Sequence, residues 1–350
     1  MKVVSVNASE NYNVLIGTNL IGQIGAYIYE IAPKASIAII SDTNVWSHYG
    51  QVLTQSILDY GMHVTHFVFP AGEASKNMNT YMDILNFLAE NKLSRSDAIV
   101  ALGGGVVGDI TGFAAATYLR GISYIQVPTT LLAMVDSSVG GKTAIDLPAG
   151  KNLVGAFKQP RLVLCDVDTL KTLPTRLFLD GCAEVIKYAM LYDPELFEML
   201  LQEGCDFDRE SVISRCVSLK RDVVQEDEFD NGARQMLNFG HTIGHSIEAK
   251  SHFEISHGQA VAAGMAIATK AAVNQGICPC HVYNKLINLL KRFQLPVTTT
   301  FSVETLFTSA LSDKKRSGST VNIIVPENIG ICKVLPISVS KLEDFIKAGL

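Results

Sequence analysis

The first half of the chain alternates short apolar runs, rich in β-branched residues, with stretches whose apolar residues recur at helical spacing. Buried strands are predicted for the runs at residues 36–41, 64–70, 97–102 and 122–127. Helices are predicted for residues 74–91 and for the stretch from Gly105 to about residue 119. Because strands that alternate with helices form parallel sheets, this half predicts a Rossmann-like α/β domain that binds a nucleotide.

The pattern changes near Leu173, where long amphipathic stretches begin and strand-like runs become rare. Helices are predicted for residues 183–201, 212–224, 237–248, 260–275 and 282–293. A late β-like run at residues 320–325 predicts a hairpin edge. A chain of 350 residues is long enough for two domains, so we expect an α/β domain over residues 1–172 and a mainly α-helical domain over residues 173–350.

Composition and charge exclude several classes of protein. The chain is 48% hydrophobic and 18% charged, which is typical of a well-buried enzyme and not of a disordered protein. Its net charge of −5 argues against a nucleic-acid partner, so any anion site must be a local cluster of Lys and Arg. No signal peptide or membrane-spanning run is evident, and the seven scattered cysteines favour reduced thiols, so we expect a cytoplasmic protein without a membrane partner.

The richest candidate for metal chemistry is the stretch Asn238-Phe239-Gly240-His241-Thr242-Ile243-Gly244-His245. In a helix, His241 and His245 would share one face about one turn apart and could hold one ion. An isolated pair at this spacing is equally compatible with two half-buried histidines bonded to backbone carbonyls. His257 in the next apolar stretch and Glu184 far upstream favour the metal, because imidazoles with a carboxylate suit a catalytic zinc site with an open position.

A glycine-rich loop follows the predicted strand at residues 97–102. The run Gly103-Gly104-Gly105-Val106-Val107-Gly108-Asp109 satisfies G-x-G-x-x-G and opens a helix, so its backbone N–H groups can approach a diphosphate. The usual fingerprint has an acid at the end of the following strand, but here the strand-end acid, Asp42, comes earlier. We therefore expect a non-standard Rossmann variant in which Asp42 contacts ribose hydroxyls; a glycine turn without a ligand is the alternative.

Two further segments are candidates for anion contacts. The loop Gly72-Glu73-Ala74-Ser75-Lys76 either contacts the adenosine half of a nucleotide or is only a helix start. Residues 128–155 show neither helical nor strand periodicity, and irregular segments of this length are usually functional. Lys142 and Lys151 in this segment stand beside glycines, which suits phosphate binding, although solvated surface lysines give the same pattern.

The cationic side chains of this net-acidic chain stand near its motifs. Glu184 and Lys187 are three residues apart on a predicted apolar helix and should both face inward, which marks sites more often than it adds stability. The other members of the set are Arg120, Lys220, Arg221, Arg234, Lys314 and Lys315. If the set converges, its ligand carries more than one negative group, such as a carboxylate and a phosphate. Each residue alone is compatible with an ordinary surface charge.

Taken together, these motifs resemble the 3-dehydroquinate synthase family of sugar-phosphate cyclases. The matching blocks extend from Asp42 to Lys315 and include residues 70–73, 103–109, 127–142, 150–155, 181–187, 234–245 and 257–258. The resemblance implies an enzyme that uses NAD and Zn²⁺ or Co²⁺ to convert 3-deoxy-D-arabino-heptulosonate 7-phosphate into 3-dehydroquinate and phosphate in the shikimate pathway. The implied route is transient oxidation, phosphate elimination, reduction and aldol cyclisation. The family also implies a phosphorus–oxygen lyase that forms a homodimer.

The resemblance assigns roles to the residues that match the family's motifs. It implies that Glu184, His241 and His257 are the metal ligands, so that His245 leaves the metal and serves substrate binding and proton transfer. The implied substrate pocket comprises Asp136, Lys142, Asn152, Lys187, Lys220, Arg234, Asn238 and His245, with Arg120 and either Lys314 or Lys315 as additions. The implied NAD contacts are Asp42, Asn44, Ala71, Gly72, Glu73, Ala74, Ser75, Lys76, Gly104, Gly105, Val106, Val107, Gly108, Asp109, Thr129, Thr130, Lys142, Lys151, Thr169, Leu170, Lys171 and Thr172.

Three alternatives remain open from the sequence. A metal-dependent polyol dehydrogenase would bind NAD and a histidine-rich metal site but release NADH, and the cationic set argues against it. A cyclase for a heptulose 7-phosphate without the carboxylate would not need Arg234, which the resemblance pairs with that carboxylate. A nucleotide-binding regulatory protein fits poorly, because every position that carries chemistry is filled.

Overall fold

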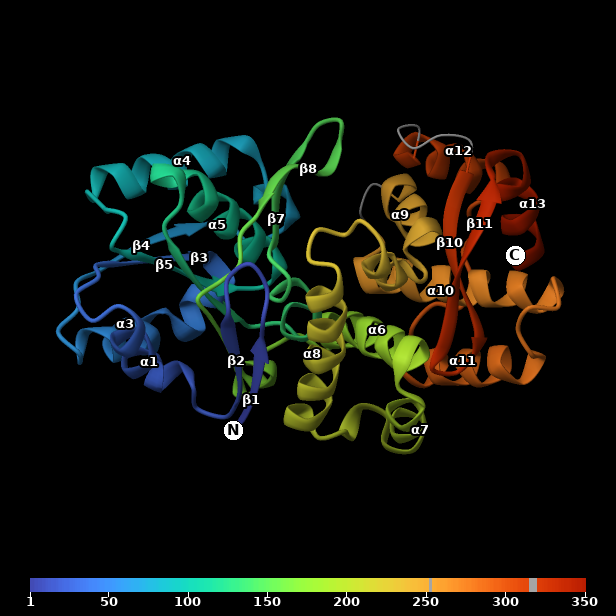
Figure 1. The fold of residues 1–350 in the computed structure, drawn as a ribbon, viewed down its shortest axis with the longest axis horizontal. Coiled ribbons are helices and arrows are strands. Elements are labelled where there is room, and N and C mark those ends of the chain that lie inside the picture. Colours follow the sequence, from blue (N-terminus) through green and yellow to red (C-terminus); the bar gives the residue numbers. More distant parts are fainter. Residues whose placement is uncertain (252–253, 315–319) are drawn as a thin grey trace. The chain divides into compact units, whose positions relative to one another are not determined.

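The computed structural model describes residues 1–251, 254–314 and 320–350, with the backbone alone at residues 312–314. The chain forms two units (Figure 1). One comprises Met1–Pro174 and Arg209–Phe229, and the other comprises Thr175–Asp208 and Asp230–Leu350. The sequence placed residues 209–229 in the helical domain, whereas they pack in the first unit. None of the helices in the described ranges combines the length and apolar character that crossing a membrane requires.

The first unit is built on a seven-stranded sheet with the order β1-β2-β9-β6-β5-β3-β4. The strands are β1 (Lys2–Val6), β2 (Tyr12–Gly17), β3 (Ile37–Asp42), β4 (Val64–Phe69), β5 (Ala98–Gly103), β6 (Ser123–Pro128) and β9 (Leu162–Asp166). Only β1 and β2, a hairpin that the sequence did not predict, pair antiparallel; the other neighbours are parallel. The parallel strands follow the flavodoxin-like order, whose switch point lies between β3 and β5.

Helices cover both faces of this sheet (Figure 1). Helices α1 (Ile24–Ile31) and α3 (Gln51–Leu58) pack on one face, and α4 (Met78–Glu90) and α5 (Gly105–Thr117) pack on the other. Alternate strand residues face opposite sides, so Ile39 joins the first core and Ile40 the second. The helix predicted from residue 74 begins only at Met78. The Asn77 side chain caps it by accepting hydrogen bonds from the backbone N–H groups of Asn79 and Thr80.

The prediction that residues 128–155 are irregular was wrong. A short helical turn, Ala133–Ser137, is followed by an antiparallel hairpin of β7 (Lys142–Leu147) and β8 (Gly150–Phe157). In β8 the half-buried Val154 and Ala156 alternate with the exposed Leu153 and Phe157. Apolar residues therefore lie on both faces of the strand and leave no alternating pattern in the sequence. Helix α8 (Arg209–Glu226), the last element of the unit, packs against β1 and the Ala133–Ser137 turn.

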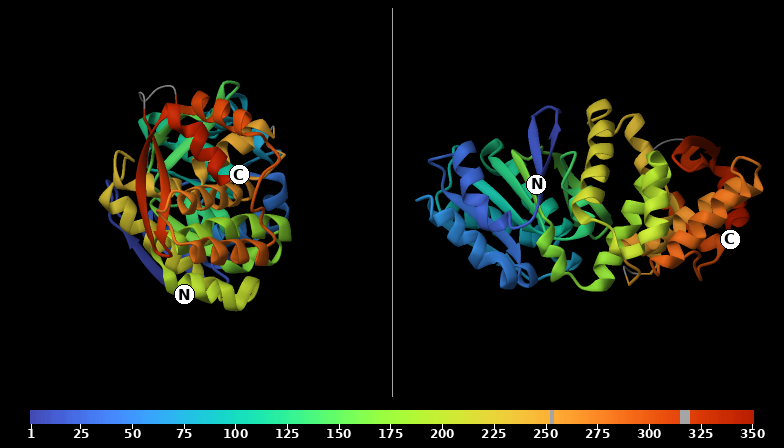
Figure 2. Two further views of the ribbon diagram at one scale, coloured as in Figure 1. Left: turned by 90° about the vertical axis from the view of Figure 1, so that its right-hand side faces the viewer. Right: turned by 90° about the horizontal axis from the view of Figure 1, so that it is seen from below.

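In its described residues the second unit is mainly helical, with one hairpin of β10 (Thr320–Asn328) and β11 (Ile331–Ser338). Its helices are α6 (Thr175–Tyr192), α7 (Pro194–Glu203), α9 (His241–Lys250), α10 (His257–Asn274), α11 (Cys280–Arg292), α12 (Val303–Lys314) and α13 (Val339–Gly349). Helix α10 is buried along most of its length and contacts α6, α9, α11, α13 and β10. Figure 2 shows this helix in orange beside the red hairpin. The α/β unit and the helical unit confirm the predicted fold class.

Two predicted helices of this unit are broken in the structure. The stretch predicted at residues 183–201 ends at Tyr192 and restarts at Pro194, because the Asp193 side chain caps a new helix that has proline in its first turn. The stretch predicted at residues 237–248 is interrupted at Gly240, which has a φ of 78° and separates a helical turn, Ala233–Asn238, from α9.

Candidate active site

The glycine loop lies at the switch point of the sheet. Strand β5 ends at Gly103, and its neighbour β3 ends at Asp42. The two strand ends are tied together by the Ser41 hydroxyl, which donates to the Leu102 carbonyl over 2.7 Å. Ligands of open α/β sheets bind at this position, outside the carboxyl ends of the strands. The sheet order therefore explains why the strand-end acid comes before the glycine loop in the chain.

Side chains approach two glycines of the loop closely. A Cβ on Gly103 would lie 2.5 Å from Val107 Cγ2, inside the turn that leads into α5. A Cβ on Gly108 would lie 2.8 Å from Gln126 Oε1, where α5 packs on β6. The loop thus holds the N-terminus of α5 against the sheet, and the backbone N–H groups of that terminus are suited to an anion.

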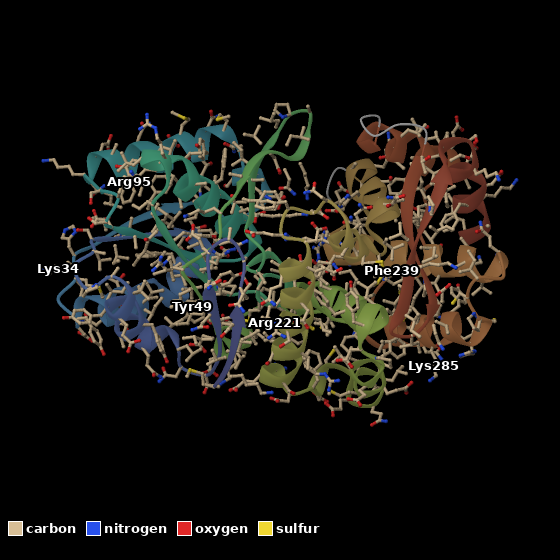
Figure 3. All side chains as sticks on the ribbon, viewed as in Figure 1. Lys34, Tyr49, Arg95, Arg221, Phe239 and Lys285 are labelled. Atoms are coloured by element: carbon tan, nitrogen blue, oxygen red, sulfur yellow. The ribbon has the colours of Figure 1, made fainter. Side chains whose placement is uncertain are left out.

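Other predicted NAD residues gather at the same edge. The Thr129 N–H donates to the Gly103 carbonyl over 2.9 Å, while the Thr129 hydroxyl is buried and has no hydrogen-bond partner among the described residues. An unpaired buried hydroxyl costs about 1–3 kcal/mol, which fits a ligand at this edge. The segment after β9 reaches the turn after β3, because the Tyr49 hydroxyl (labelled in Figure 3) lies 2.5 Å from Thr172 Oγ1 and donates to the Thr169 carbonyl over 3.3 Å.

Lys76 joins the second loop to the glycine loop and the β7–β8 hairpin. Its buried ammonium donates to Asp109 Oδ2 over 2.6 Å and to Asn152 Oδ1 over 2.5 Å. Burial opposes the charged form of Lys76, but the carboxylates of Asp109, Glu73 and Asp146 together outweigh burial and raise the pKa of Lys76. Lys151 lies 3.3 Å from Glu73 in the same neighbourhood. The Lys76 ammonium therefore binds protein side chains, and it holds Asp109 and Asn152, which are both predicted to contact ligands.

Replacing Lys76 by methionine should destabilise the first unit by roughly 3 kcal/mol, because it leaves the Asp109 carboxylate without its cation. The double variant Lys76→Met/Asp109→Leu should recover most of this loss, since an apolar pair replaces the ion pair. The exposed Lys34, labelled in Figure 3, provides the control, and Lys34→Met should change stability by less than about 0.5 kcal/mol. Urea unfolding of the four proteins measures this, and equal losses in Lys76→Met and Lys34→Met would contradict it.

Apart from Asn152, which contacts Lys76, the predicted substrate residues of the first unit lie at three separate places. Lys220 on α8 is buried and lies 2.9 Å from Asp136 Oδ1, and it also donates to the Asp136 carbonyl, so these two residues form one ion pair. Lys142 is exposed at the start of β7. Arg120 lies just beyond the far end of α5, whose 13 residues span about 20 Å from the glycine loop. The structure therefore does not bring Arg120 to the glycine loop of its own chain.

In the second unit, the predicted metal ligands Glu184, His241 and His257 lie together. Glu184 Oε1 is 3.6 Å from His241 Nε2 and 3.4 Å from His257 Nε2. Their ligand atoms all lie within 4.8 Å of one another. The Glu184 side chain is fully buried, and a buried carboxylate facing two imidazoles is the donor set of many catalytic zinc sites. The cluster fits a divalent ion with one position open.

Close helix packing creates this cluster from three separate helices. A Cβ on Gly240 would lie 2.6 Å from the Val261 carbonyl, so this glycine lets the start of α9 approach α10. A Cβ on Gly258 would lie 2.0 Å from the Asp180 carbonyl, so α10 approaches α6 equally closely. Asp180, one turn before Glu184, also accepts a hydrogen bond from the Gln259 N–H over 3.1 Å. The N-terminus of α10, with His257, is thereby placed opposite Glu184.

Contacts around the cluster orient its members. His241 Nδ1 lies 3.1 Å from the Phe239 carbonyl, and Figure 3 labels Phe239 in this unit. A carbonyl only accepts, so Nδ1 carries the proton and Nε2 offers its lone pair toward Glu184. The Lys187 ammonium contacts Glu184 Oε2, so one carboxylate oxygen faces the lysine and the other faces the histidines. Glu184 and Lys187 thus share an inward face, as their spacing predicted.

The electrostatics of the cluster favour a cation beside Glu184. Burial, together with the charge of Lys187, lowers the pKa of His241 to about 3, so this imidazole is neutral and can bind a metal. Burial would also lower the pKa of His257, but hydrogen bonds to Glu184 and Glu248 outweigh it and raise that pKa to about 10. The Glu184 and Glu248 carboxylates thus favour a positive charge beside His257.

The remaining predicted residues of this unit lie outside the cluster of Glu184, His241 and His257. His245 is exposed on α9, with its ring centroid 5.4 Å from that of His241 and 6.3 Å from that of His257. It also belongs, with Glu248 and His257, to a second group whose ligand atoms lie within 4.8 Å of one another. On the helical turn before α9, Arg234 is buried and Asn238 is exposed. The side chain of Lys314 and the whole of Lys315 lie outside the described residues.

Glu248 and Asp180 both contact the start of α10, and neither was predicted from the sequence as a site residue. Glu248 stands seven residues after His241, so that His241, His245 and Glu248 follow the i, i+4, i+7 spacing of one helix face. That spacing was visible in the sequence. Asp180 stands four residues before Glu184 on α6, but its role depends on the packing of α10 and left no comparable signal.

The α/β unit and the helical unit place the chain in a class of synthases with solved structures. A structure of 2-deoxy-scyllo-inosose synthase, complexed with carbaglucose-6-phosphate, NAD⁺ and Co²⁺, is similar over 100% of both chains, with a TM-score of 0.89 and 27% identity. A structure of 2-epi-5-epi-valiolone synthase from Streptomyces hygroscopicus, with NAD⁺ and Zn²⁺ bound, is similar over 99% of this chain and 98% of the other, with a TM-score of 0.86 and 25% identity.

Within this class, the chain belongs to the 3-dehydroquinate synthase family. Residues 66–180 match the family described as 3-dehydroquinate synthase N-terminal. Residues 181–316 match the family described as 3-dehydroquinate synthase C-terminal. A 3-dehydroquinate synthase of Clostridium acetobutylicum is 46% identical over 339 residues, which cover 95% of each chain. The family recognised from the sequence motifs is thereby confirmed.

Proposed function

We propose that the protein is a 3-dehydroquinate synthase, which converts 3-deoxy-D-arabino-heptulosonate 7-phosphate into 3-dehydroquinate and phosphate. The observation that carries the proposal is the buried Glu184 carboxylate facing Nε2 of His241 and His257, in a chain whose two halves both match the family. A regulatory nucleotide-binding protein would not need this donor set, because burying a carboxylate is costly unless a cation or a metal ion compensates its charge.

Two cofactors are part of the proposal. Glu184, His241 and His257 would hold Zn²⁺ or Co²⁺, and the glycine loop, Asp42 and the loop at Lys76 would hold NAD. When bound, the metal supplies a Lewis acid for the substrate hydroxyls and NAD supplies a reversible oxidation. Support comes from the synthase structures that contain NAD⁺ with Co²⁺ or Zn²⁺. It also comes from the buried Thr129 hydroxyl at the carboxyl edge of the sheet, which has no hydrogen-bond partner among the described residues.

The charged residues of the chain are proposed to bind the two anionic ends of the substrate. The buried guanidinium of Arg234 is suited to the carboxylate, since Arg binds carboxylates in a planar two-point contact. Lys142, Lys187 and Lys220 are suited to the phosphate and the hydroxyls as compact charges. His245, which lies on the metal-bearing helix but remains exposed, is suited to moving a proton to or from the substrate. Asp136 orients Lys220 through their ion pair.

Product analysis tests the proposal directly. The protein is incubated with 3-deoxy-D-arabino-heptulosonate 7-phosphate, NAD and Zn²⁺ or Co²⁺, and phosphate and 3-dehydroquinate are measured together. We expect equal amounts of the two products. In a parallel reaction, a heptulose 7-phosphate without the carboxylate should react poorly, because Arg234 would lose its partner. Efficient turnover of that second sugar would favour another cyclase of the same class, and accumulation of NADH without phosphate would favour a polyol dehydrogenase.

The family resemblance also leads us to propose the finer assignments of enzyme class, assembly and location. These are a phosphorus–oxygen lyase, a homodimer and a cytoplasmic enzyme of aromatic amino acid biosynthesis. For the assembly, sedimentation equilibrium should give twice the chain mass of 37.9 kDa. A mass equal to that of one chain would contradict the homodimer.

A further inference from the structure

On the basis of the metal site proposed above, we propose that Glu248 is a positioning residue that holds His257 in the tautomer and orientation required to bind the ion. Glu248 lies on α9, while His257 is the first residue of α10. The Glu248 carboxylate faces Nδ1 of His257, and the opposite ring nitrogen of His257 faces Glu184. Glu248 therefore acts on the metal through a histidine and not by direct contact.

The two nitrogens of the His257 ring face two different carboxylates. Nδ1 lies 3.2 Å from Glu248 Oε2, and Nε2 lies 3.4 Å from Glu184 Oε1. Both carboxylates accept, so each ring nitrogen of His257 faces an acceptor. When a metal replaces the proton on Nε2 beside Glu184, the contact with Glu248 keeps the remaining proton on Nδ1. The nitrogen that faces Glu184 is then the one that can give its lone pair to a metal. Metal-bound histidines commonly use their second nitrogen in this way, which fixes the ring and raises its basicity.

The same arrangement recurs at His241 with a weaker partner. There the Phe239 carbonyl lies 3.1 Å from Nδ1, and Nε2 again faces Glu184. The two ligands are therefore oriented alike, each with its δ nitrogen held by the protein and its ε nitrogen directed to Glu184. Because a carboxylate is a stronger acceptor than a neutral carbonyl, Glu248 makes His257 the more strongly donating ligand of the pair.

Glu248 is buried, which distinguishes a residue that positions His257 from an ordinary surface charge. Its side chain is only 5% exposed, whereas the His257 side chain is 31% exposed. Removing a carboxylate from water costs several kcal/mol unless hydrogen bonds or charges offset the loss. His257 is more open to solvent than the residue that orients it, so its position depends on contacts such as the one to Glu248.

Zinc binding to the metal-free protein tests the proposal without substrate or NAD. Glu248→Leu removes the acceptor, and its zinc affinity should fall about 10- to 100-fold, the range expected for loss of an outer partner of a metal-bound histidine. Glu248→Gln keeps an acceptor oxygen but loses the charge, so its affinity should fall by no more than about tenfold. Glu254→Gln, at an exposed glutamate nearby, is the matched control and should bind zinc as the wild type does. Competition with a chromophoric chelator measures these affinities.

Two further readouts distinguish positioning from other roles. Because the three ligands remain, every variant should still bind one zinc per chain at saturation, and the absorption spectrum of bound Co²⁺ should change in Glu248→Leu but not in Glu254→Gln. Wild-type zinc affinity in both Glu248 variants would overturn the proposal. So would two ions per wild-type chain falling to one in the variants, because Glu248 would then be a ligand, with His245 and His257, of a second ion.

Folding is checked by thermal unfolding of the metal-free proteins. If Glu248→Leu does not fold, Glu248→Gln decides the matter, and unchanged zinc affinity in that variant overturns the proposal. Because no substrate is used, the outcome is independent of the proposed synthase activity. A protein that binds zinc as expected but forms no 3-dehydroquinate would contradict the proposed function and leave the role of Glu248 supported.

Discussion

Replacing His241 by alanine is expected to remove the metal from the protein, whereas replacing His245 by alanine is expected to leave it in place. The two histidines stand one helical turn apart on α9, but only the ε nitrogen of His241 faces the buried Glu184 carboxylate. Loss of His241 should weaken zinc binding by more than about 100-fold, which exceeds the loss of an outer partner, and should abolish turnover. His245→Ala should slow turnover by about 10²- to 10⁴-fold, as expected for a lost proton-transfer group.

Metal analysis after dialysis, together with phosphate release, measures both variants. We expect the zinc content of His245→Ala to be close to that of the wild type and that of His241→Ala to be close to zero. Equal metal loss in the two variants would contradict the division of roles and would favour the simpler interpretation of His-x3-His as a pair of ligands. Unchanged turnover in His245→Ala would remove it from the chemistry.

Replacing Gly240 by alanine is expected to disrupt the metal cluster through the backbone. Gly240 has a φ of 78°, which costs an L-residue about 1–2 kcal/mol, and its Cβ would lie 2.6 Å from both the Val261 carbonyl and Met265 Cγ. We therefore expect Gly240→Ala to lower the free energy of unfolding by roughly 3 kcal/mol. Because His241 is the next residue, zinc affinity should fall as well.

Gly276 offers a matched control for this variant. It has a similar φ of 71°, but nothing lies within 4 Å of the position that a Cβ would occupy. Gly276→Ala should therefore show the backbone cost alone, about 1–2 kcal/mol, with unchanged zinc affinity. Urea unfolding and zinc titration of both variants compare the two. If Gly276→Ala and Gly240→Ala are equally destabilised, the close packing of α9 on α10 does not contribute as described.

Local sequence patterns predicted four parallel strands of the α/β unit, β3, β4, β5 and β6, and most of the helices, but not β1, β2 or β9. They were sufficient because buried parallel strands are short, apolar and bounded by polar or glycine residues, as at Asp42 and Gly103. They failed where one residue decides a break. Asp193 and Gly240 each interrupt a continuous apolar pattern, because capping and a left-handed backbone conformation outweigh periodicity. The β7–β8 hairpin was missed because apolar residues lie on both faces of β8, so its sequence shows no alternation of apolar and polar residues.

The site was predictable in its members but not in its geometry. Spacing alone made His241 and His245 equal candidates for the metal, and only the packing of α6, α9 and α10 directs one of them to Glu184. The position of Asp42 beside the glycine loop likewise required the order of the sheet, since β3 neighbours β5. Such contacts join residues far apart in the chain, so they depend on close approaches like that of Gly258 to Asp180.

The proposed synthase activity requires NAD to act as a catalyst that is restored in every turnover. This is tested by supplying NAD at about one-tenth of the concentration of 3-deoxy-D-arabino-heptulosonate 7-phosphate and following phosphate, 3-dehydroquinate and NADH together. We predict complete conversion of the sugar phosphate to phosphate and 3-dehydroquinate, with no lasting rise in NADH. Conversion that stops when the NAD is exhausted, with a matching amount of NADH, would contradict the synthase and identify a dehydrogenase.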